Sequence, residues 1–285
     1  MTPMPSYVLS ARSLLFVPAH RADRYSKALA SGADTVVIDL EDSVAPNAKD
    51  AARAALDAAW EGLDNRERIL IRINAIDSVE FADDAALCAS LRPAGVLVPK
   101  AEHDDSLSAL HERLGGLALV PMIESATGWV NLQAIACARG TARLAFGNID
   151  FQADLGMTAS DDEHELGPVR LALVAASRVA GIAAPIDGVT VETGDAARVT
   201  MATRRCRRFG FTGKLCVHPD QIAAVHVAFA PDAAEVAWAR RVLEAAEAGG
   251  GAAAQIDGRM IDRPVILLAE RTLALAAQRD IRTMP

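Results

Sequence analysis

Eight short apolar runs recur along the chain, and each is followed by a stretch with helical character. The runs cover residues 12–18, 35–41, 69–74, 95–100, 117–124, 142–150, 186–191 and 213–218. They are continuously apolar rather than alternating, which is typical of strands buried on both faces of a parallel sheet. Eight such strands, each followed by a helix, predict an α/β fold of the (β/α)8 TIM-barrel type. A doubly wound sheet is the alternative, but no Gly-x-Gly-x-x-Gly motif follows the first strand to support a dinucleotide site.

The barrel is expected to be complete by residue 230, and a C-terminal helical arm or lid is expected beyond it. A helix is predicted over residues 232–248, then a break at Gly249-Gly250-Gly251, a strand-like piece over 254–257 and an amphipathic helix over 265–278. A glycine hinge lets the segment beyond it move, as a lid does. The domain prediction is a catalytic barrel of residues 1–230 and an arm of residues 231–285.

Composition and charge narrow the class of protein. The 285 residues carry a formal net charge of −8, which argues against a general nucleic-acid or anionic-membrane binder. No run approaches the roughly 18 uncharged apolar residues of a membrane helix, and we find no signal-peptide pattern at the N-terminus.

The cysteines are Cys88, Cys137, Cys206 and Cys216. They lack paired metal-binding spacing and lie on apolar stretches, so we expect buried free thiols in a cytoplasmic protein.

Two acidic residues close the fifth and sixth apolar runs, Glu124 and Asp150. A carboxylate at the end of a buried strand is costly to desolvate and therefore needs a partner. In a parallel barrel both carboxylates reach the face where such barrels keep their active sites. Two carboxylates that converge there suggest a hard divalent cation, most simply Mg2+. The pattern therefore predicts a metal-dependent enzyme.

Charged residues also interrupt the second, third and fourth runs. Asp39 and Glu41 are alternate residues of one strand, so they share a face. Arg72 lies among apolar neighbours and must meet anions, which could be this acidic pair, a substrate enolate oxygen, or both at once. Lys100 ends the fourth run and could complete the network. Alternatively, Lys100 could act as a nucleophile that forms a Schiff base with the substrate, although a site that holds a metal would not need one.

The first loop and one glycine add further candidates. Arg21, Arg24 and Lys27 follow the first strand, which places three cations on the catalytic face of an acidic protein. They form a reasonable site for phosphates. Gly147 precedes Asp150 and would let the backbone approach a ligand closely, although a simple turn also explains it.

Most of these residues fall in motifs that belong together. The motifs cover residues 12–18, 39–46, 72–74, 98–100, 123–126, 146–150, 210–219 and 257–262. In this order they span nearly the whole chain, which resembles the citrate lyase β-subunit-like proteins of the HpcH/HpaI aldolase superfamily, close to malyl-CoA and citramalyl-CoA lyases. One departure is Ala19-His20, where relatives often have glycine followed by a polar residue.

The resemblance implies a barrel that binds Mg2+, with Mn2+ able to substitute, and that assembles as a homotrimer or hexamer. Glu124 and Asp150 match the metal carboxylates of the family. Arg72 matches its substrate and enolate arginine. Asp262 matches an acid/base aspartate that the C-terminal arm delivers, commonly into the site of a neighbouring subunit.

The resemblance also implies the substrate. Arg24 and Lys27 fall where the family contacts the phosphates of coenzyme A, and Asp39, Glu41 and Lys100 complete the predicted substrate-binding set. The implied activity is reversible carbon–carbon cleavage of a malyl-, citramalyl- or citryl-CoA type thioester to an acyl-CoA and a small 2-oxo acid, by retro-Claisen/aldol chemistry. The alternatives are a malyl-CoA-type thioesterase, a CoA-independent class II pyruvate aldolase, or a citrate lyase β subunit that acts only with an acyl-carrier partner.

Overall fold

The structure is a computed structural model, and it describes residues 6–248 and 254–283. Eight parallel strands close into a barrel in sequence order, so that β1 pairs with both β2 and β8. They are β1 (Ser13–Pro18), β2 (Thr35–Asp39), β3 (Ile69–Arg72), β4 (Gly95–Val98), β5 (Leu119–Ile123), β6 (Arg143–Phe146), β7 (Ala183–Asp187) and β8 (Gly213–Cys216). The predicted (β/α)8 fold is confirmed.

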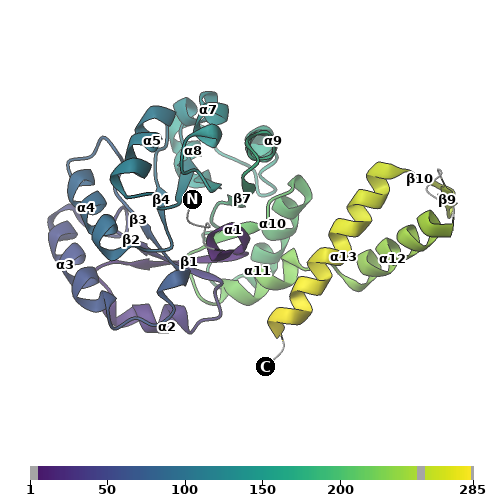
Figure 1. Cartoon of the computed structure of the whole chain (residues 1–285), viewed down its shortest axis with the longest axis horizontal. Helices are drawn as coiled ribbons and strands as arrows, with labels where there is room; N and C mark the ends of the chain where they lie inside the picture. The colour runs from purple at the N-terminus through teal and green to yellow at the C-terminus, as the bar shows by residue number, and fades with distance from the viewer. Residues whose placement is uncertain (1–5, 249–253, 284–285) are drawn as a thin grey trace. The chain divides into compact units, whose positions relative to one another are not determined.

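Helices surround the strands of the barrel (Figure 1). They are α1 (Ser6–Ser10), α2 (Tyr25–Leu29), α3 (Lys49–Trp60), α4 (Phe81–Leu91), α5 (Asp104–Arg113), α6 (Ala126–Val130), α7 (Leu132–Cys137), α8 (Asn148–Leu155), α9 (Gly167–Ala180), α10 (Ala196–Phe209) and α11 (Gln221–Phe229). Short 3-10 turns cover Ala22–Arg24, Pro46–Ala48, Arg66–Arg68 and His164–Leu166. The strands are continuously apolar because one face of each packs inside the barrel and the other packs against these helices.

Two of the eight strands differ from the predicted runs by three residues or more at an end. The sixth strand ends at Phe146, because Gly147 leaves the extended conformation and Asn148 starts α8. Asp150 therefore lies in the first turn of a helix and not at the end of a strand. The seventh strand begins at Ala183 and includes Pro185, beside a register shift between β6 and β7. The observed strand is therefore shifted toward the N-terminus from the predicted run of residues 186–191, and proline is tolerated at such an irregularity.

The N-terminal end of the barrel holds a fully buried cation, Arg143 on β6. Its guanidinium donates to the carbonyl oxygens of Ala11 (2.8 Å) and Ala184 (2.5 Å), and to Thr212 Oγ1 (2.9 Å). Burial lowers the pKa of Arg143 to about 9. These contacts tie the segment after α1 to the barrel floor, at the end opposite the predicted site.

The residues after the barrel form a second compact unit, residues 227–285, distinct from unit 1–226. It contains α12 (Ala233–Ala248), an antiparallel hairpin of β9 (Ala254–Ile256) and β10 (Arg259–Ile261), and α13 (Arg263–Thr283). The two helices pack around a small core of Ala239, Val242, Ile261 and Ala269. The predicted strand-like piece is thus half of a hairpin, which turns at Asp257-Gly258 with positive φ at both residues. The predicted break at residues 249–251 lies outside the described residues.

One helical stretch, Gln221–Ala248, is long and apolar enough to cross a membrane by length and composition alone. It consists of α11 and α12, which are interrupted around Pro231. The helices of soluble proteins pass the same test, so this stretch is weak evidence for a membrane span.

The cysteine prediction is partly wrong. Cys88, Cys206 and Cys216 are buried free thiols, and burial raises the pKa of each. Cys137 is exposed, because it is the last residue of α7 and points away from the apolar face formed by Leu132, Ile135 and Ala136.

A buried ionic cluster joins the last two strands to α9. Arg170 Nε donates to Asp187 Oδ1 at 2.9 Å, and Lys214 Nζ lies 3.4 Å from Asp187 Oδ2. All three side chains are almost completely buried. Burial raises the pKa of Asp187, but the charges of Lys214 and Arg170 outweigh it and hold the pKa below its usual value.

We expect Asp187→Ala to lower the free energy of unfolding by about 3–5 kcal/mol, because Lys214 and Arg170 would lose a buried counter-ion. As a control, Asp161→Ala removes one of two ion-pair partners of Arg198 at the surface, where Asp161 is 92% exposed, and should change the free energy of unfolding far less. Urea denaturation measures both. Equal losses in the two variants would contradict a structural role for the buried cluster.

Candidate active site

A cavity of about 410 Å³ opens at the carboxyl ends of the barrel strands. Its charged lining residues are Asp39, Asp42, Arg72 and Asp150, and its apolar lining includes Phe16, Met122, Phe146 and Leu215. The lining comes from strands on both sides of the barrel, so the cavity lies where (β/α)8 barrels bind their ligands.

Arg72, the last residue of β3, is held by two acidic residues at the end of the neighbouring strand β2. They are Asp39, the last residue of β2, and Glu41, two residues further on. Its Nε and Nη2 donate to the two carboxylate oxygens of Asp39 at 2.6 and 2.8 Å, and Nη1 lies 2.8 Å from Glu41 Oε2. Burial lowers the pKa of Arg72, but the contacts with Asp39 outweigh it, so the pKa is raised. The same pairing keeps the pKa of buried Asp39 below its usual value. Arg72 is therefore a fixed cation, stacked over Phe16 with 4.8 Å between its guanidinium carbon and the ring centre.

Lys100 joins this network from the end of β4. Its Nζ donates to Glu41 Oε1 at 2.8 Å, and the side chain is about half exposed. Burial raises the pKa of Glu41 more than Arg72 and Lys100 lower it. For Lys100, burial lowers the pKa, but the bond to Glu41 outweighs it, so the amine is held as a cation. A charged lysine is a poor Schiff-base nucleophile, which argues against a Schiff-base role.

Glu124 follows β5 and is only 3% exposed. Its Oε1 accepts the backbone N–H of Lys100 at 2.7 Å, a contact that Lys100 makes with a left-handed backbone (φ 46°). Within the described part of the chain, Oε2 accepts no hydrogen bond although it is buried. Burial, the charge of Glu41 and the charge of Asp150 raise the pKa of Glu124 to about 8, against the lowering effect of the Lys100 N–H. A buried carboxylate oxygen without a donor is suited to a cation.

Gly147 makes room for this carboxylate. A Cβ atom at position 147 would lie 2.2 Å from Glu124 Oε2 and 2.5 Å from Glu124 Cβ. The close approach expected at Gly147 therefore involves Glu124. Asp150, two residues beyond Asn148 on the exposed rim of the cavity, acts electrostatically on Glu124. Together Glu124 and Asp150 offer carboxylate oxygens that could hold a divalent cation.

Asn148 is a buried polar residue of the cavity that the sequence pattern missed. Its Nδ2 donates to the carbonyl oxygen of Val189 at 3.2 Å, while its Oδ1 is buried and has no donor in the described segments. A Cβ atom at Gly188 would lie 2.0 Å from that Oδ1. The signal in the sequence is a pair of glycines, Gly147 and Gly188, each of which directly follows a strand of the barrel.

The remaining predicted residues lie outside this cluster. Arg24 and Lys27 are exposed on the turn and helix that follow β1, while Arg21 is paired with Asp23 at 2.8 Å. Asp262 belongs to the second unit, where its Oδ1 accepts the N–H of Val265 at 3.4 Å at the start of α13. The barrel therefore brings together Asp39, Glu41, Arg72, Lys100 and Glu124 without the arm. The roles predicted for Arg24, Lys27 and Asp262 stay predictions.

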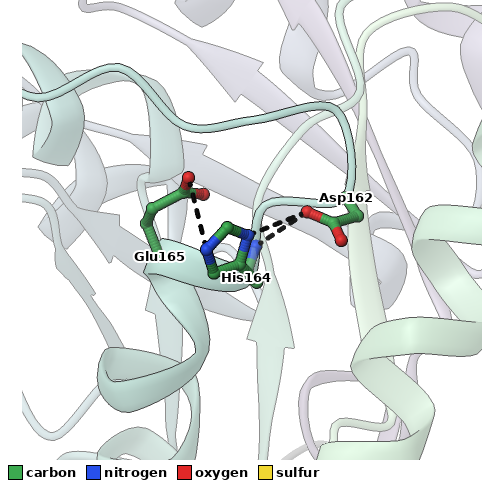
Figure 2. A group of neighbouring side chains, drawn as sticks. All are labelled: Asp162, His164 and Glu165. Carbon is green, nitrogen blue, oxygen red and sulfur yellow. Dashed lines mark hydrogen bonds and ion pairs between the residues drawn. The ribbon is translucent and has the colours of Figure 1, made fainter.

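A second acidic cluster lies on the loop before α9 (Figure 2). His164 Nδ1 lies 3.1 Å from Asp162 Oδ1, and His164 Nε2 lies 3.6 Å from Glu165 Oε1. Hydrogen bonding to Asp162 and the charge of Glu165 raise the pKa of His164. These side chains satisfy one another near the surface, unlike the buried Glu124 oxygen, so we assign no metal to them.

The chain matches the HpcH/HpaI aldolase/citrate lyase family over residues 12–219. It is 35% identical over 277 residues to a citrate lyase subunit beta-like protein of Deinococcus radiodurans, with 92% of this chain and 96% of that protein covered. It is 30% identical over 275 residues to a (3S)-malyl-CoA thioesterase of Cereibacter sphaeroides, with 93% and 94% covered.

The fold is also similar to a crystal structure of protein CitE from Mycobacterium tuberculosis in complex with magnesium, acetoacetate and coenzyme A. The TM-score is 0.86 at 33% sequence identity, and the match covers 94% of this chain and 98% of that one. These likenesses confirm the resemblance drawn from the motifs. The chain belongs to the HpcH/HpaI aldolase/citrate lyase family.

Proposed function

We propose that this protein is a metal-dependent carbon–carbon lyase acting on a 3-hydroxyacyl-CoA thioester whose carbinol carbon bears a carboxylate. The products are an acyl-CoA and a 2-oxo acid, and the reaction is reversible. The observation that carries the proposal is the joint placement of Glu124, with a buried unpaired oxygen, and Arg72, a fixed cation, in one network at the mouth of the barrel. The network pairs a cation site with a separate anion-stabilising group, which is what this cleavage requires.

Glu124 and Asp150 are the residues that would hold Mg2+, with Mn2+ as a substitute. The relative from M. tuberculosis holds magnesium together with acetoacetate and coenzyme A. The buried Oε2 of Glu124 and the carboxylate of Asp150 suit a hard cation. When bound, Mg2+ supplies Lewis-acid polarisation of the carbinol oxygen as it becomes the keto oxygen of the 2-oxo acid.

Arg72 would stabilise the thioester enolate that the cleavage leaves behind. A guanidinium has five N–H groups, and Asp39 takes one from Nε and one from Nη2. Nη1 also lies 2.8 Å from Glu41 Oε2, so the N–H groups that remain can face the cavity that Arg72 lines. Because Asp39 and Glu41 already fix its orientation, little reorganisation accompanies the development of negative charge on the enolate oxygen.

Asp262 is the proposed proton donor to the enolate carbon, and the base in the reverse condensation. We propose that the arm delivers it into the site of a neighbouring subunit in a homotrimer or hexamer. Arg24 and Lys27 are exposed cations on the loop after β1, suited to the phosphates of coenzyme A, and Lys100 remains a substrate contact. A cytoplasmic location stays a prediction.

A malyl-CoA-type thioesterase is the second candidate, because a relative at 30% identity carries that activity in its name. The same enolate chemistry could precede loss of the thioester. A CoA-independent class II pyruvate aldolase would instead act on a substrate without coenzyme A. A citrate lyase β subunit would act only on an acyl group held by its carrier partner.

We expect the purified protein alone to cleave malyl- or citramalyl-CoA to an acyl-CoA and a 2-oxo acid when Mg2+ is present. Citryl-CoA is tested beside them. Chromatography separates the acyl-CoA from free coenzyme A, which a thioesterase would release. Chelation of the metal should remove the activity. Full turnover in chelator contradicts the proposal, and activity that appears only with a carrier protein favours the complex-bound subunit.

Glu124→Gln should lower kcat by at least about 1,000-fold and weaken Mg2+ binding, since the amide keeps the shape but loses the charge. Glu165→Gln is the matched control, because Glu165 belongs to the exposed cluster that we assign to no metal. Calorimetry measures Mg2+ binding, and the chromatographic assay measures kcat. Tight Mg2+ binding by Glu124→Gln would exclude Glu124 as a ligand.

Asp262→Asn should abolish turnover while Mg2+ binding to the barrel stays unchanged, because the arm supplies only the proton. Asp257→Asn, in the same unit and paired with Arg241, is the control and should remain active. A mixture of Asp262→Asn and Glu124→Gln chains should regain activity if the arm acts across subunits. An active Asp262→Asn variant would remove this residue from the mechanism.

A further inference from the structure

Lys49, the first residue of α3, is a buried amine behind the candidate site. Its Nζ donates to the carbonyl oxygens of Leu40 (2.7 Å) and Glu41 (2.8 Å) and to Asn74 Oδ1 (2.7 Å). An ammonium group has three donors, so every one is used. The N-terminal end of a helix disfavours a cation. Lys49 therefore occupies an electrostatically unfavourable position, which its three hydrogen bonds to Leu40, Glu41 and Asn74 offset.

A second layer of buried polar groups holds Lys49 in place. Asn74 donates through its backbone N and its Nδ2 to Asp84 Oδ2, at 2.8 and 2.7 Å. Asp84 is fully buried and accepts from Arg53 Nη1 at 2.9 Å through its other oxygen. The relay Arg53–Asp84–Asn74–Lys49 thus joins α3, α4 and the end of β3. It ends on the backbone carbonyl groups of Leu40 and Glu41, which lie on either side of the Glu41 Cα atom.

Glu41 is the residue through which this relay reaches the site. Its carboxylate lies 2.8 Å from Arg72 Nη1 and 2.8 Å from Lys100 Nζ. Glu41 lies two positions after the last residue of β2, and its backbone N–H donates to Asp39 Oδ1 at 2.9 Å instead of to a neighbouring strand. The Leu40 oxygen also accepts from Asn74 Nδ2 at 3.0 Å and the Glu41 oxygen from the Val44 N–H at 3.0 Å, but Lys49 is the one of these three donors that bonds to both oxygens.

We infer that Lys49 is a positioning residue of the proposed lyase: it fixes the backbone of Glu41, and Glu41 in turn sets the orientation of Arg72 and Lys100. This inference rests on the proposed function for its catalytic consequence. Its structural part, that Lys49 determines where the Glu41 carboxylate lies, stands independently of the reaction.

A double-mutant cycle tests the catalytic consequence. We expect Lys49→Met to lower kcat by about 10- to 100-fold, with the affinity for Mg2+ unchanged, because Glu124 and Asp150 are untouched. Glu41→Gln should lower kcat by a similar factor. The double variant should lie within about threefold of Glu41→Gln, because Lys49 acts through Glu41. Multiplied losses in the double variant would overturn the inference.

Arg143→Met is the matched control, since Arg143 is also buried and donates to backbone carbonyls, but at the opposite end of the barrel. It should lower stability and leave the kcat of the folded protein within about threefold of the wild type. An equal loss of kcat in Arg143→Met would assign the effect of Lys49→Met to general destabilisation. Lys49→Gln, which keeps a donor, replaces Lys49→Met in the cycle if the methionine variant does not fold.

A crystal structure of the Lys49 variant separates this inference from the proposed function. The Glu41 carboxylate should lose its contact with Arg72 or Lys100. Unchanged contacts would overturn the positioning role, whatever the enzyme does. A wild-type protein without lyase activity would overturn the proposed function and leave this structural test intact.

Discussion

The burial of the Glu124 carboxylate is the constraint on which the site depends. The side chain is enclosed at the end of β5, receives one backbone N–H, and keeps its other oxygen without a donor among the described residues. Only glycine at position 147 leaves space for it. A protein keeps such a costly arrangement when something outside the chain completes it, and a divalent cation is the simplest partner.

The second constraint is the excess of negative charge around the cavity. Asp39 and Glu41 are paired with Arg72 and Lys100, which fixes the two cations. We therefore propose Glu124 and Asp150 as the carboxylates that would hold a cation. On this proposal, the residues that would hold a metal are separate from the arginine that would stabilise a developing anion. The proposal that Glu124 and Asp150 bind the metal while Arg72 binds the enolate rests on that separation.

Much of the fold and part of the candidate site could be predicted from the sequence, because buried parallel strands leave a strong pattern of apolar runs. The eight apolar runs predicted the barrel, and Arg72 among isoleucines predicted a contact with Asp39 or Glu41. Asp150 was placed on a strand, because an apolar run does not reveal that the backbone turns at Gly147. Lys49 was missed, although a lysine on the buried face of α3, in line with Ala52, Arg53 and Leu56, was a usable signal. Contacts between distant residues, such as the Lys100 N–H to Glu124, depend on the closed barrel and have no local signature.

The most direct test of the account is the number of protons that Mg2+ displaces when it binds. Since burial and the charges of Glu41 and Asp150 raise the pKa of Glu124 to about 8, the carboxyl group is mostly protonated at pH 7 without metal. Calorimetry in buffers of different ionisation enthalpy should show close to one proton released per Mg2+ at pH 7 and close to none at about pH 9, with affinity rising between them. Glu124→Gln should release none. Binding at pH 7 without proton release, or the same release in Glu124→Gln, would contradict the assignment of Glu124 as the buried metal ligand.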